Sequence, residues 1–187
     1  MNYPNGIKKT YTSTITKPTD YKNRGMNLEK DINDSNKFYI EKDKAYIYKK
    51  PTPIKLVKVD YKKNKITEAY FDTPSTTDYN GIYKGKYIDF EAKETVNTKG
   101  FPLGNIHKHQ IKHLRNIDKE NGISFLIVRF TKLNKTYLLL TKDLLKFIDE
   151  VNKSIIPIDY FNEVGYLIKD KFLPRVDYLE IIDKMGV

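Results

Sequence analysis

The sequence contains no cysteine. That absence excludes disulfide bonds, a catalytic thiolate and a zinc site built on cysteine sulfur. It also lacks any run of about 18 consecutive apolar residues, so no membrane-spanning helix is predicted. The polar start, MNYPNG over residues 1–6, has none of the apolar character of a signal peptide. We therefore expect a cytoplasmic protein that makes no contact with a membrane.

Positive charge is in excess across the 187 residues, with 34 Lys and Arg against 24 Asp and Glu, for a net charge of +10. Such a balance suits a polyanionic partner such as nucleic acid, through neutralisation of phosphates. The alternative is a soluble protein with an ordinary lysine-rich composition, and charge alone does not separate the two. The hydrophobic share of 39% is enough for a packed core, and the length fits one domain.

The first 23 residues are polar, carry lysines and show no periodicity, which predicts a flexible basic tail ahead of a domain over residues 24–187. Within that domain the apolar spacing and the turn residues predict an α/β fold, in which a central mixed sheet is flanked by helices. The expected helices cover residues 26–36, 105–116, 142–152 after a Thr141 cap, 159–165 and 174–185. The expected strands cover residues 45–48, 76–83, 86–94, 123–130 and 135–140, with a loop over 100–104.

A lysine-rich stretch follows the first expected strand. Residues 49–65 contain seven lysines, two prolines and one acid, Asp60. Proline cannot donate to a sheet ladder, and this density of like charge favours a projecting arm that touches DNA over a central strand. A solvated edge hairpin is the alternative.

The residues with the clearest chemical meaning lie in the hairpin over 76–94. Strand side chains alternate between faces, so Ile88, Phe90 and Ala92 share an apolar face while Glu91 and Lys93 share the other. Pairing the strands about the Gly85 turn brings Asp78 near the level of residues 91–93. Two carboxylates would then converge beside one ammonium, and carboxylate oxygens are preferred ligands of Mg²⁺. Asp89 has the same parity but lies further along the strand, where it is not expected to share the metal.

This arrangement predicts phosphodiester hydrolysis. Asp78 and Glu91 would hold one or two Mg²⁺ ions, with Mn²⁺ as a possible substitute, and Lys93 would stabilise the charge that develops on the scissile phosphate. The alternative is a cross-strand ladder of salt bridges without catalytic meaning, because exposed strands often carry Glu and Lys.

The following helix offers two further polar features. Gln110 stands in the apolar stripe of Ile106, Leu114 and Ile117, so its amide needs a buried partner, either the metal site or a backbone group. His109 and His113 are spaced for a metal, but no Glu follows His109 as in a metalloprotease and no cysteine is available. A surface helix near DNA is favoured for these histidines.

Several blocks occur in an order that resembles the RecU family of Holliday junction resolvases. They are RGMNLEKDI (24–32), KKPTPIKLVKV (49–59), PSTTDYNGIYKGKYIDFEAKET (74–95), FPLGNIHKHQ (101–110) and PRVDYL (174–179). The resemblance implies a restriction-endonuclease-like core of the PD-(D/E)xK type. It also implies a homodimer that cuts four-way DNA junctions by paired symmetrical nicks in recombination and repair, with a RecA-type recombinase as a possible partner.

The resemblance also assigns roles to individual residues. It places metal ligands at Thr76, with the adjacent Thr77 as the alternative, and at Asp78, Glu91 and Gln110. It also places a transition-state-stabilising lysine at Lys93 and a glutamate of the first helix near the site at Glu29. It makes residues 50–72 a stalk that enters the junction. The DNA-binding residues that it implies are Arg24, Lys55, Lys58, Lys62, Lys63, Lys65 and Phe71. Two other functions stay open from the sequence: a sequence-specific restriction-type nuclease and a non-enzymatic basic DNA-binding module.

Overall fold

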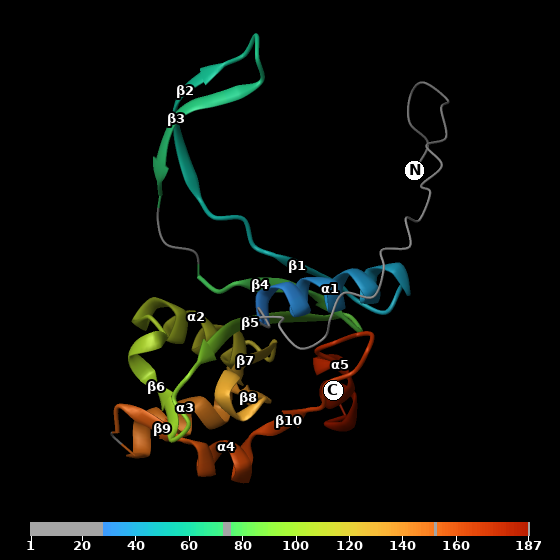
Figure 1. Cartoon of the computed structure of the whole chain (residues 1–187), viewed down its shortest axis with the longest axis vertical. Coiled ribbons are helices and arrows are strands. Elements are labelled where there is room, and N and C mark those ends of the chain that lie inside the picture. Colours follow the sequence, from blue (N-terminus) through green and yellow to red (C-terminus); the bar gives the residue numbers. More distant parts are fainter. Residues whose placement is uncertain (1–27, 73–75, 152, 187) are drawn as a thin grey trace.

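A computed structural model describes residues 28–72, 76–151 and 153–186. The expected tail over residues 1–23 and Arg24 lie outside this described part. Figure 1 shows the helices and strands along the chain. In order they are α1 (Leu28–Glu41), β1 (Tyr46–Lys49), β2 (Ile54–Asp60), β3 (Lys65–Phe71), β4 (Tyr79–Tyr83), β5 (Lys86–Thr95), β6 (Gly100–Pro102), η1 (Leu103–Asn105), α2 (Lys108–Lys119), β7 (Ile123–Phe130), η2 (Thr131–Leu133), β8 (Lys135–Leu140), α3 (Thr141–Val151), β9 (Ile155–Pro157), α4 (Ile158–Val164), β10 (Tyr166–Ile168) and α5 (Tyr178–Lys184).

The central sheet has six strands in the order β1-β4-β5-β7-β8-β10. Strands β5 and β7 run parallel with α2 connecting them, while the other neighbouring pairs are antiparallel. Every residue of β7, the expected strand over 123–130, is buried, and most of them are apolar. The expectation of a central mixed sheet flanked by helices is confirmed.

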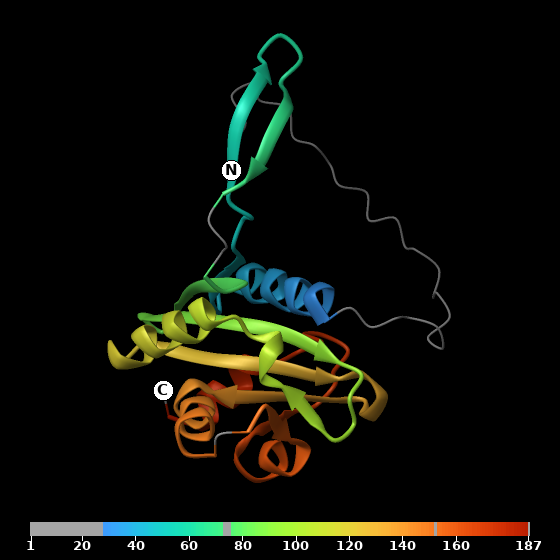
Figure 2. The ribbon, with the colours of Figure 1, turned by 90° about the vertical axis from the view of Figure 1, so that its left-hand side faces the viewer.

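Helices cover both faces of the sheet (Figure 2). On one face α1 and α5 pack against β5 and β7 through Ile32, Phe90, Phe125 and Tyr178. On the other face the side chains of α2, α3 and α4 meet those of β7 and β8. Because β5 lies between two packed layers, the side chains on its second face are shielded from water as well. The polar residues Asp89 and Glu91 are therefore buried, although a half-exposed strand would have left them in solvent.

One charged residue interrupts the apolar run of β7. Arg129 is fully buried, and its guanidinium lies 2.7 Å from Asp31 of α1 and 3.1 Å from Thr136 of β8. A buried charge is tolerated only when it is paired and hydrogen-bonded. This pair therefore holds α1 against the sheet.

The hairpin of β4 and β5 has the predicted turn. Lys84 and Gly85 have φ values of 48° and 76°, the backbone conformation that a two-residue hairpin turn requires. Tyr79 pairs with Phe90 across the hairpin. This register brings the preceding residue, Asp78, to the level of Glu91, as the sequence predicted.

Strands β2 and β3 form a separate two-stranded sheet that projects far from the body (Figures 1 and 2). We call residues 50–72 the stalk. The prediction of a projecting arm is confirmed, and the alternative of a hairpin along the edge of the central sheet is wrong. Among the described residues the stalk strands pair only with each other, because prolines and a high density of lysines interrupt the chain between β1 and β4.

The boundaries of some elements differ from the predictions. Helix α1 ends at Glu41 rather than near 36, because Tyr39 extends its buried face. Residues 100–104, expected as a loop, contain β6, which pairs with β9. The last helix begins only at Tyr178. Three-residue strands such as β6, β9 and β10 show no periodicity, so only tertiary pairing reveals them. No helix in the described ranges is both long enough and apolar enough to cross a membrane.

Gly81 offers a test of the β1–β4 contact. A Cβ atom at this position would lie 2.1 Å from the backbone oxygen of Tyr46, which has no freedom to move away. We expect Gly81→Ala to destabilise the protein by about 2–3 kcal/mol in urea denaturation. Gly104→Ala is the matched control, because no described atom lies within 4 Å of a Cβ there. Equal unfolding midpoints for the two variants would contradict the close β1–β4 approach.

Candidate active site

Asp78 and Glu91 come together at the point where β4 begins beside β5. One carboxylate oxygen of Asp78 accepts a hydrogen bond from the Ala92 backbone N–H at 3.3 Å, which fixes it against β5. Glu91 is completely buried. The Lys93 ammonium forms an ion pair with Glu91, with Nζ 2.5 Å from Oε1. The predicted convergence of two carboxylates and one ammonium is present.

The electrostatics of Glu91 follow from this environment. Burial raises the pKa of Glu91, the nearby charge of Asp78 raises it further, and the Lys93 ammonium lowers it, which leaves a pKa of about 7. A carboxyl group that ionises near neutrality beside a second carboxylate is characteristic of functional sites rather than of surface salt bridges.

The donor set fits a divalent cation. The single Lys93 ammonium balances only one of the two neighbouring carboxylate charges, and a hard ion such as Mg²⁺ takes carboxylate oxygens as ligands while keeping several waters. No group of three or more His, Cys, Asp or Glu residues capable of holding a metal occurs among the described residues. The remaining ligands would therefore be amide, hydroxyl or carbonyl oxygens and water.

A recess of about 190 Å³ opens beside the carboxylates, and Leu28, Glu29, Asp78, Lys93 and Glu94 are among its lining residues. Glu94 accepts a hydrogen bond from the first backbone N–H of α1 at 3.0 Å, which positions the start of the helix at this recess. Glu29 then projects from the first turn and pairs with Lys49 at 2.6 Å. The structure therefore places Glu29 next to Asp78 and Lys93, in agreement with the expectation for the first helix.

Thr76 and Gln110 are engaged elsewhere. The hydroxyl of Thr76 accepts a hydrogen bond from the Lys50 ammonium at 3.0 Å. Gln110 is buried, and its side-chain oxygen accepts the backbone N–H of His107 at 2.9 Å, so the amide caps the start of α2. The sequence left two partners open for the Gln110 amide, the metal site or a backbone group, and in this structure the partner is a backbone group. Metal ligation by Thr76 and Gln110 stays a prediction.

The three histidines do not gather into a metal site within the described residues. His107 and His109 are exposed, with stacked rings 5.4 Å apart. His113 instead turns inward, and its Nε2 lies 3.1 Å from Asp89.

Comparison with known proteins identifies the family of the chain. The family model described as "Recombination protein U" (RecU) matches residues 23–184. The chain belongs to the RecU family. It is 50% identical to the Holliday junction resolvase RecU of Oceanobacillus iheyensis, over 99% of each chain. It is 48% identical to that of Pediococcus pentosaceus and to that of Streptococcus thermophilus, in each case over 99% of this chain and 97% of the relative.

A solved structure also matches in part. The Holliday junction resolvase Hjc of Archaeoglobus fulgidus aligns with a TM-score of 0.43 and 12% identity, over 71% of this chain and 91% of Hjc.

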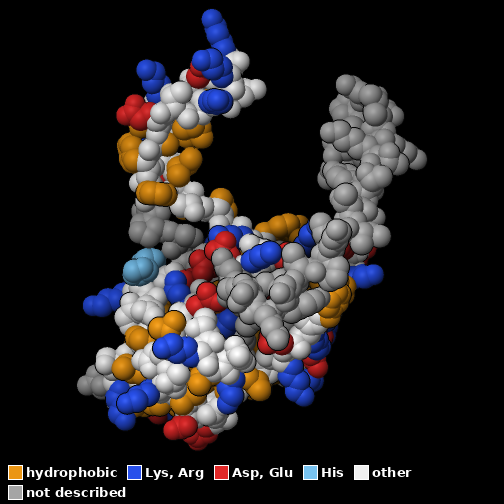
Figure 3. Space-filling model, in the orientation of Figure 1, with side chains coloured by type: hydrophobic (Ala, Val, Ile, Leu, Met, Phe, Trp, Pro, Cys, Tyr) orange, Lys and Arg blue, Asp and Glu red, His pale blue; other side chains and the backbone are white. Residues whose placement is uncertain are grey.

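The stalk of this RecU-family chain combines charge with exposed apolar surface (Figure 3). Its lysines Lys55, Lys58, Lys62, Lys63 and Lys65 are all exposed. Phe71 is 80% exposed and pairs with Ile54, so it stands at the root of the stalk, whereas Lys62 and Lys63 lie at the turn. Lys62 and Lys63 would therefore meet a different part of a bound molecule from Phe71.

The sequence did not predict that Asp89 would share the metal, and it predicted no role for Lys50. The structure joins them: Lys50 Nζ lies 2.7 Å from Asp89, which is fully buried. The polar identity of residue 89 on a buried strand is a signal for such a partner, but a single sequence does not say which lysine supplies it.

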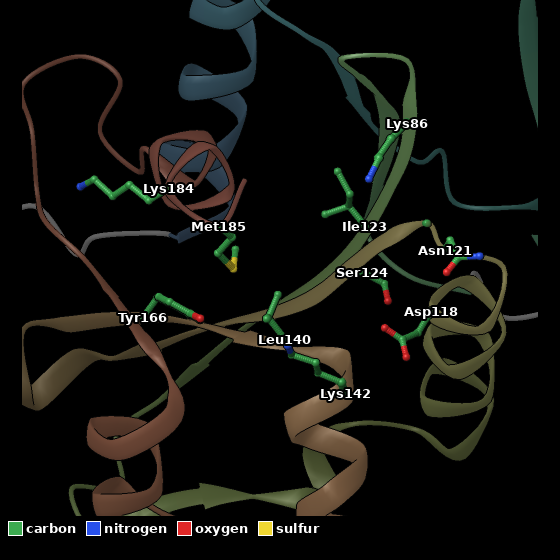
Figure 4. Close-up of a pocket in the computed structure, with 11 residues that line it drawn as sticks. Lys86, Asp118, Asn121, Ile123, Ser124, Leu140, Lys142, Tyr166, Lys184 and Met185 are labelled. Atoms are coloured by element: carbon green, nitrogen blue, oxygen red, sulfur yellow. The ribbon is translucent and has the colours of Figure 1, made fainter. Parts of the chain in front are cut away.

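The RecU-family fold also contains a larger cavity of about 540 Å³, lined by Lys86, Ser124, Lys142 and Tyr166 among others (Figure 4). It lies where β5 and β7 begin, whereas Glu91 lies past the middle of β5. This cavity is therefore separate from the carboxylate site.

Proposed function

We propose that this chain is a Mg²⁺-dependent endonuclease that resolves Holliday junctions as a homodimer, with a restriction-endonuclease-like core, in the cytoplasm during recombination and repair. The observation that carries the proposal is the cluster of Asp78, Glu91 and Lys93 in a chain of the RecU family. The full-length similarity to proteins named Holliday junction resolvase supports the choice of substrate.

Each residue of the cluster has a distinct task. Asp78 and Glu91 would hold the cation, with Gln110 and Thr76 as further oxygen donors from the family resemblance. When bound, Mg²⁺ or Mn²⁺ supplies the positive charge that polarises the scissile phosphate. The Lys93 ammonium lies beside Glu91, and its own positive charge would stabilise the phosphate oxygens. Because Glu91 is buried, its charge acts more strongly than it would in solvent.

Selectivity for a four-way junction would come from shape. The stalk offers lysines for phosphates, and its described residues present no evident set of side chains for reading base edges. Phe71 at its root is placed to stack on a distorted base at the crossover. These features favour a structure-selective nuclease over a sequence-specific restriction-type enzyme.

The stalk also supports a homodimer. A two-stranded hairpin is marginally stable by itself in water. Yet this one exposes a series of large apolar side chains at about half or more of their surface: Leu56, Val57, Ile66, Tyr70 and Phe71. A second copy that covers part of this surface would stabilise the hairpin and place two active sites on opposite strands of one junction.

The stalk lysines should control the salt dependence of junction binding. We expect replacement of Lys55, Lys58, Lys62, Lys63 and Lys65 by Gln to reduce the slope of log affinity against log salt by about 0.9 for each phosphate that is no longer neutralised. Binding titrations at several salt concentrations, in Ca²⁺ to prevent cleavage, would measure the slope. Five exposed lysines outside the stalk, at positions 132, 135, 146, 153 and 169, are the control set. Equal slopes for the two sets would show that the stalk lysines do not contact DNA phosphates.

Cleavage assays test the proposed function against its alternatives. The chain is incubated with Mg²⁺ on a labelled four-way junction, a linear duplex of the same sequence and a nicked fork. Paired symmetrical nicks on the junction alone support resolution. Cleavage of the duplex at one sequence would instead identify a restriction-type nuclease. Binding without any cut, with Asp78→Asn indistinguishable from wild type, would identify a DNA-binding module.

A further inference from the structure

A second buried carboxylate lies next to the proposed metal site. Asp89 is fully buried and two residues before Glu91 on the same face of β5. Its Oδ2 accepts hydrogen bonds from Lys50 at 2.7 Å and from the Tyr87 hydroxyl at 2.8 Å, and it lies 3.1 Å from His113 Nε2. Its Oδ1 accepts one from Thr77. Because both of its oxygens already accept hydrogen bonds, Asp89 is not expected to coordinate a metal.

Lys50 makes further hydrogen bonds, which hold the chain segment that ends in Asp78. Its backbone N–H donates to the carbonyl oxygen of Asp78 at 2.8 Å. Its ammonium donates to the hydroxyls of Thr76 at 3.0 Å and Thr77 at 2.6 Å. One residue therefore binds three consecutive residues, and through Asp89 it fixes them to the strand that carries Glu91.

The position of Lys50 in the chain adds to this role. It is the first residue after β1 and the first of the stalk, while Thr76 and Thr77 lead into β4 on the return from the stalk. Its side chain is 14% exposed, so the ammonium is largely removed from water. Lys50 thus joins the root of the stalk to the metal-binding segment.

Buried ion pairs contribute little net stability compared with apolar packing, because desolvation offsets their attraction. The Lys50–Asp89 pair is therefore better explained by the geometry that it fixes than by a contribution to stability. Groups that orient metal ligands without touching the metal typically change metal affinity or activity about 10- to 100-fold when they are removed.

We propose that Lys50 and Asp89 are positioning residues of the nuclease, which hold Asp78 at the separation from Glu91 that a divalent cation requires and couple that separation to the stalk. The inference rests on the proposed function. It adds two residues that do not themselves bind the ion or the substrate.

The test measures Mn²⁺ binding to the DNA-free protein by electron paramagnetic resonance, beside junction binding in Ca²⁺ and cleavage. The double variant Lys50→Met/Asp89→Asn removes both charges together, so that no unpaired charge stays buried. We expect its Mn²⁺ affinity to fall about 10- to 100-fold, with cleavage recovering at high Mn²⁺. Junction affinity should change by less than about threefold, because only one positive charge among many is removed. Thr77→Val, which removes a single hydroxyl, should shift Mn²⁺ affinity in the same direction by less.

Leu139→Ala serves as the control for general destabilisation, because it opens a cavity in β8 within the core on the other face of the sheet. It should lower the unfolding temperature and leave Mn²⁺ affinity unchanged. If Lys50→Met/Asp89→Asn fails to fold, Thr77→Val and Lys50→Arg decide the outcome by the same measurement. Variants that fold and keep wild-type Mn²⁺ affinity would overturn the positioning role.

The proposal and the proposed function fail in different ways. If the wild-type chain binds Mn²⁺ through Asp78 yet cuts no junction, the resolvase function is wrong, and the Mn²⁺ shift in the Lys50 and Asp89 variants still decides the positioning role. If the wild-type chain cuts junctions while these variants bind Mn²⁺ as it does, only the positioning role is wrong. A wild-type chain that binds no Mn²⁺ overturns the positioning role together with the metal site.

Discussion

Lys93→Met is expected to reduce junction cleavage about 10²- to 10³-fold, the usual loss when one preorganised group that stabilises developing charge is removed. Junction affinity measured in Ca²⁺ should stay within about threefold of wild type, since the stalk and the rest of the basic surface supply most phosphate contacts. Methionine keeps most of the aliphatic length of the lysine side chain, which is only 26% exposed, so packing at the recess is largely preserved.

A second effect of Lys93→Met must be separated from the first. The ammonium lowers the pKa of Glu91, so its loss will raise that pKa further and weaken cation binding near neutrality. Cleavage should therefore be measured at saturating Mg²⁺ as a function of pH, so that the plateaus reached at high pH are compared between the two proteins. The part of the loss that persists under these conditions is the contribution of Lys93 to the transition state.

Lys135→Met is the matched control, because Lys135 is exposed at the start of β8. It should cleave and bind as wild type does. A Lys93→Met variant that loses affinity and cleavage by the same factor would show that Lys93 binds DNA rather than stabilising the transition state.

The hairpin of β4 and β5 was predictable because its signals are local. The alternation over 87–93, the Gly85 turn and the pairing distance about it fix which residues face each other, and the structure has that register. The buried strand β7 was likewise evident from an apolar run of eight residues. Such features depend on neighbours in sequence, and a single chain contains them in full.

The contacts that the sequence did not predict join residues far apart. Lys50 and Asp89 are 39 positions apart, and Asp31 and Arg129 are 98 apart. Nothing in the intervening residues selects those partners over other lysines, arginines and acids. The hydrogen bond of the Gln110 amide is another contact that the sequence did not fully predict. The sequence identified a polar residue in an apolar stripe, but it did not identify the His107 backbone as its partner, since His107 is not one of the usual helix-capping residues.

Glu91→Gln is expected to abolish cleavage and, at the same time, to stabilise the metal-free protein at alkaline pH. In the unfolded chain Glu91 ionises at its ordinary value of 4.5, whereas in the folded, metal-free chain its pKa is about 7. Between these values the folded state holds a proton that the unfolded state has released. The free energy of unfolding therefore falls as the pH rises, and the full cost is reached above about pH 7.

The magnitude follows from the same difference. A tenfold change in proton affinity is worth about 1.4 kcal/mol, so the shift from 4.5 to about 7 corresponds to roughly 3 kcal/mol as an upper value. Glutamine is close to glutamate in size and carries no charge. In EDTA at about pH 8, Glu91→Gln should therefore be more stable than wild type by about 1–3 kcal/mol, and the two should converge at about pH 4.5. Urea denaturation at both pH values would measure this difference.

Addition of Mg²⁺ should reverse the order of stability. Wild type gains stability because the ion binds only the folded state, while Glu91→Gln lacks the charge that holds it and gains little. Glu163→Gln makes the same chemical change at an exposed position in α4, where we expect neither effect. If Glu91→Gln were instead less stable than wild type in EDTA at about pH 8, the Glu91 carboxylate would be favourably paired without a cation, as in a structural salt bridge. The physical reason for a metal at Asp78 and Glu91 would then be gone, because the charge of the buried Glu91 beside the carboxylate of Asp78 is what implies the ion.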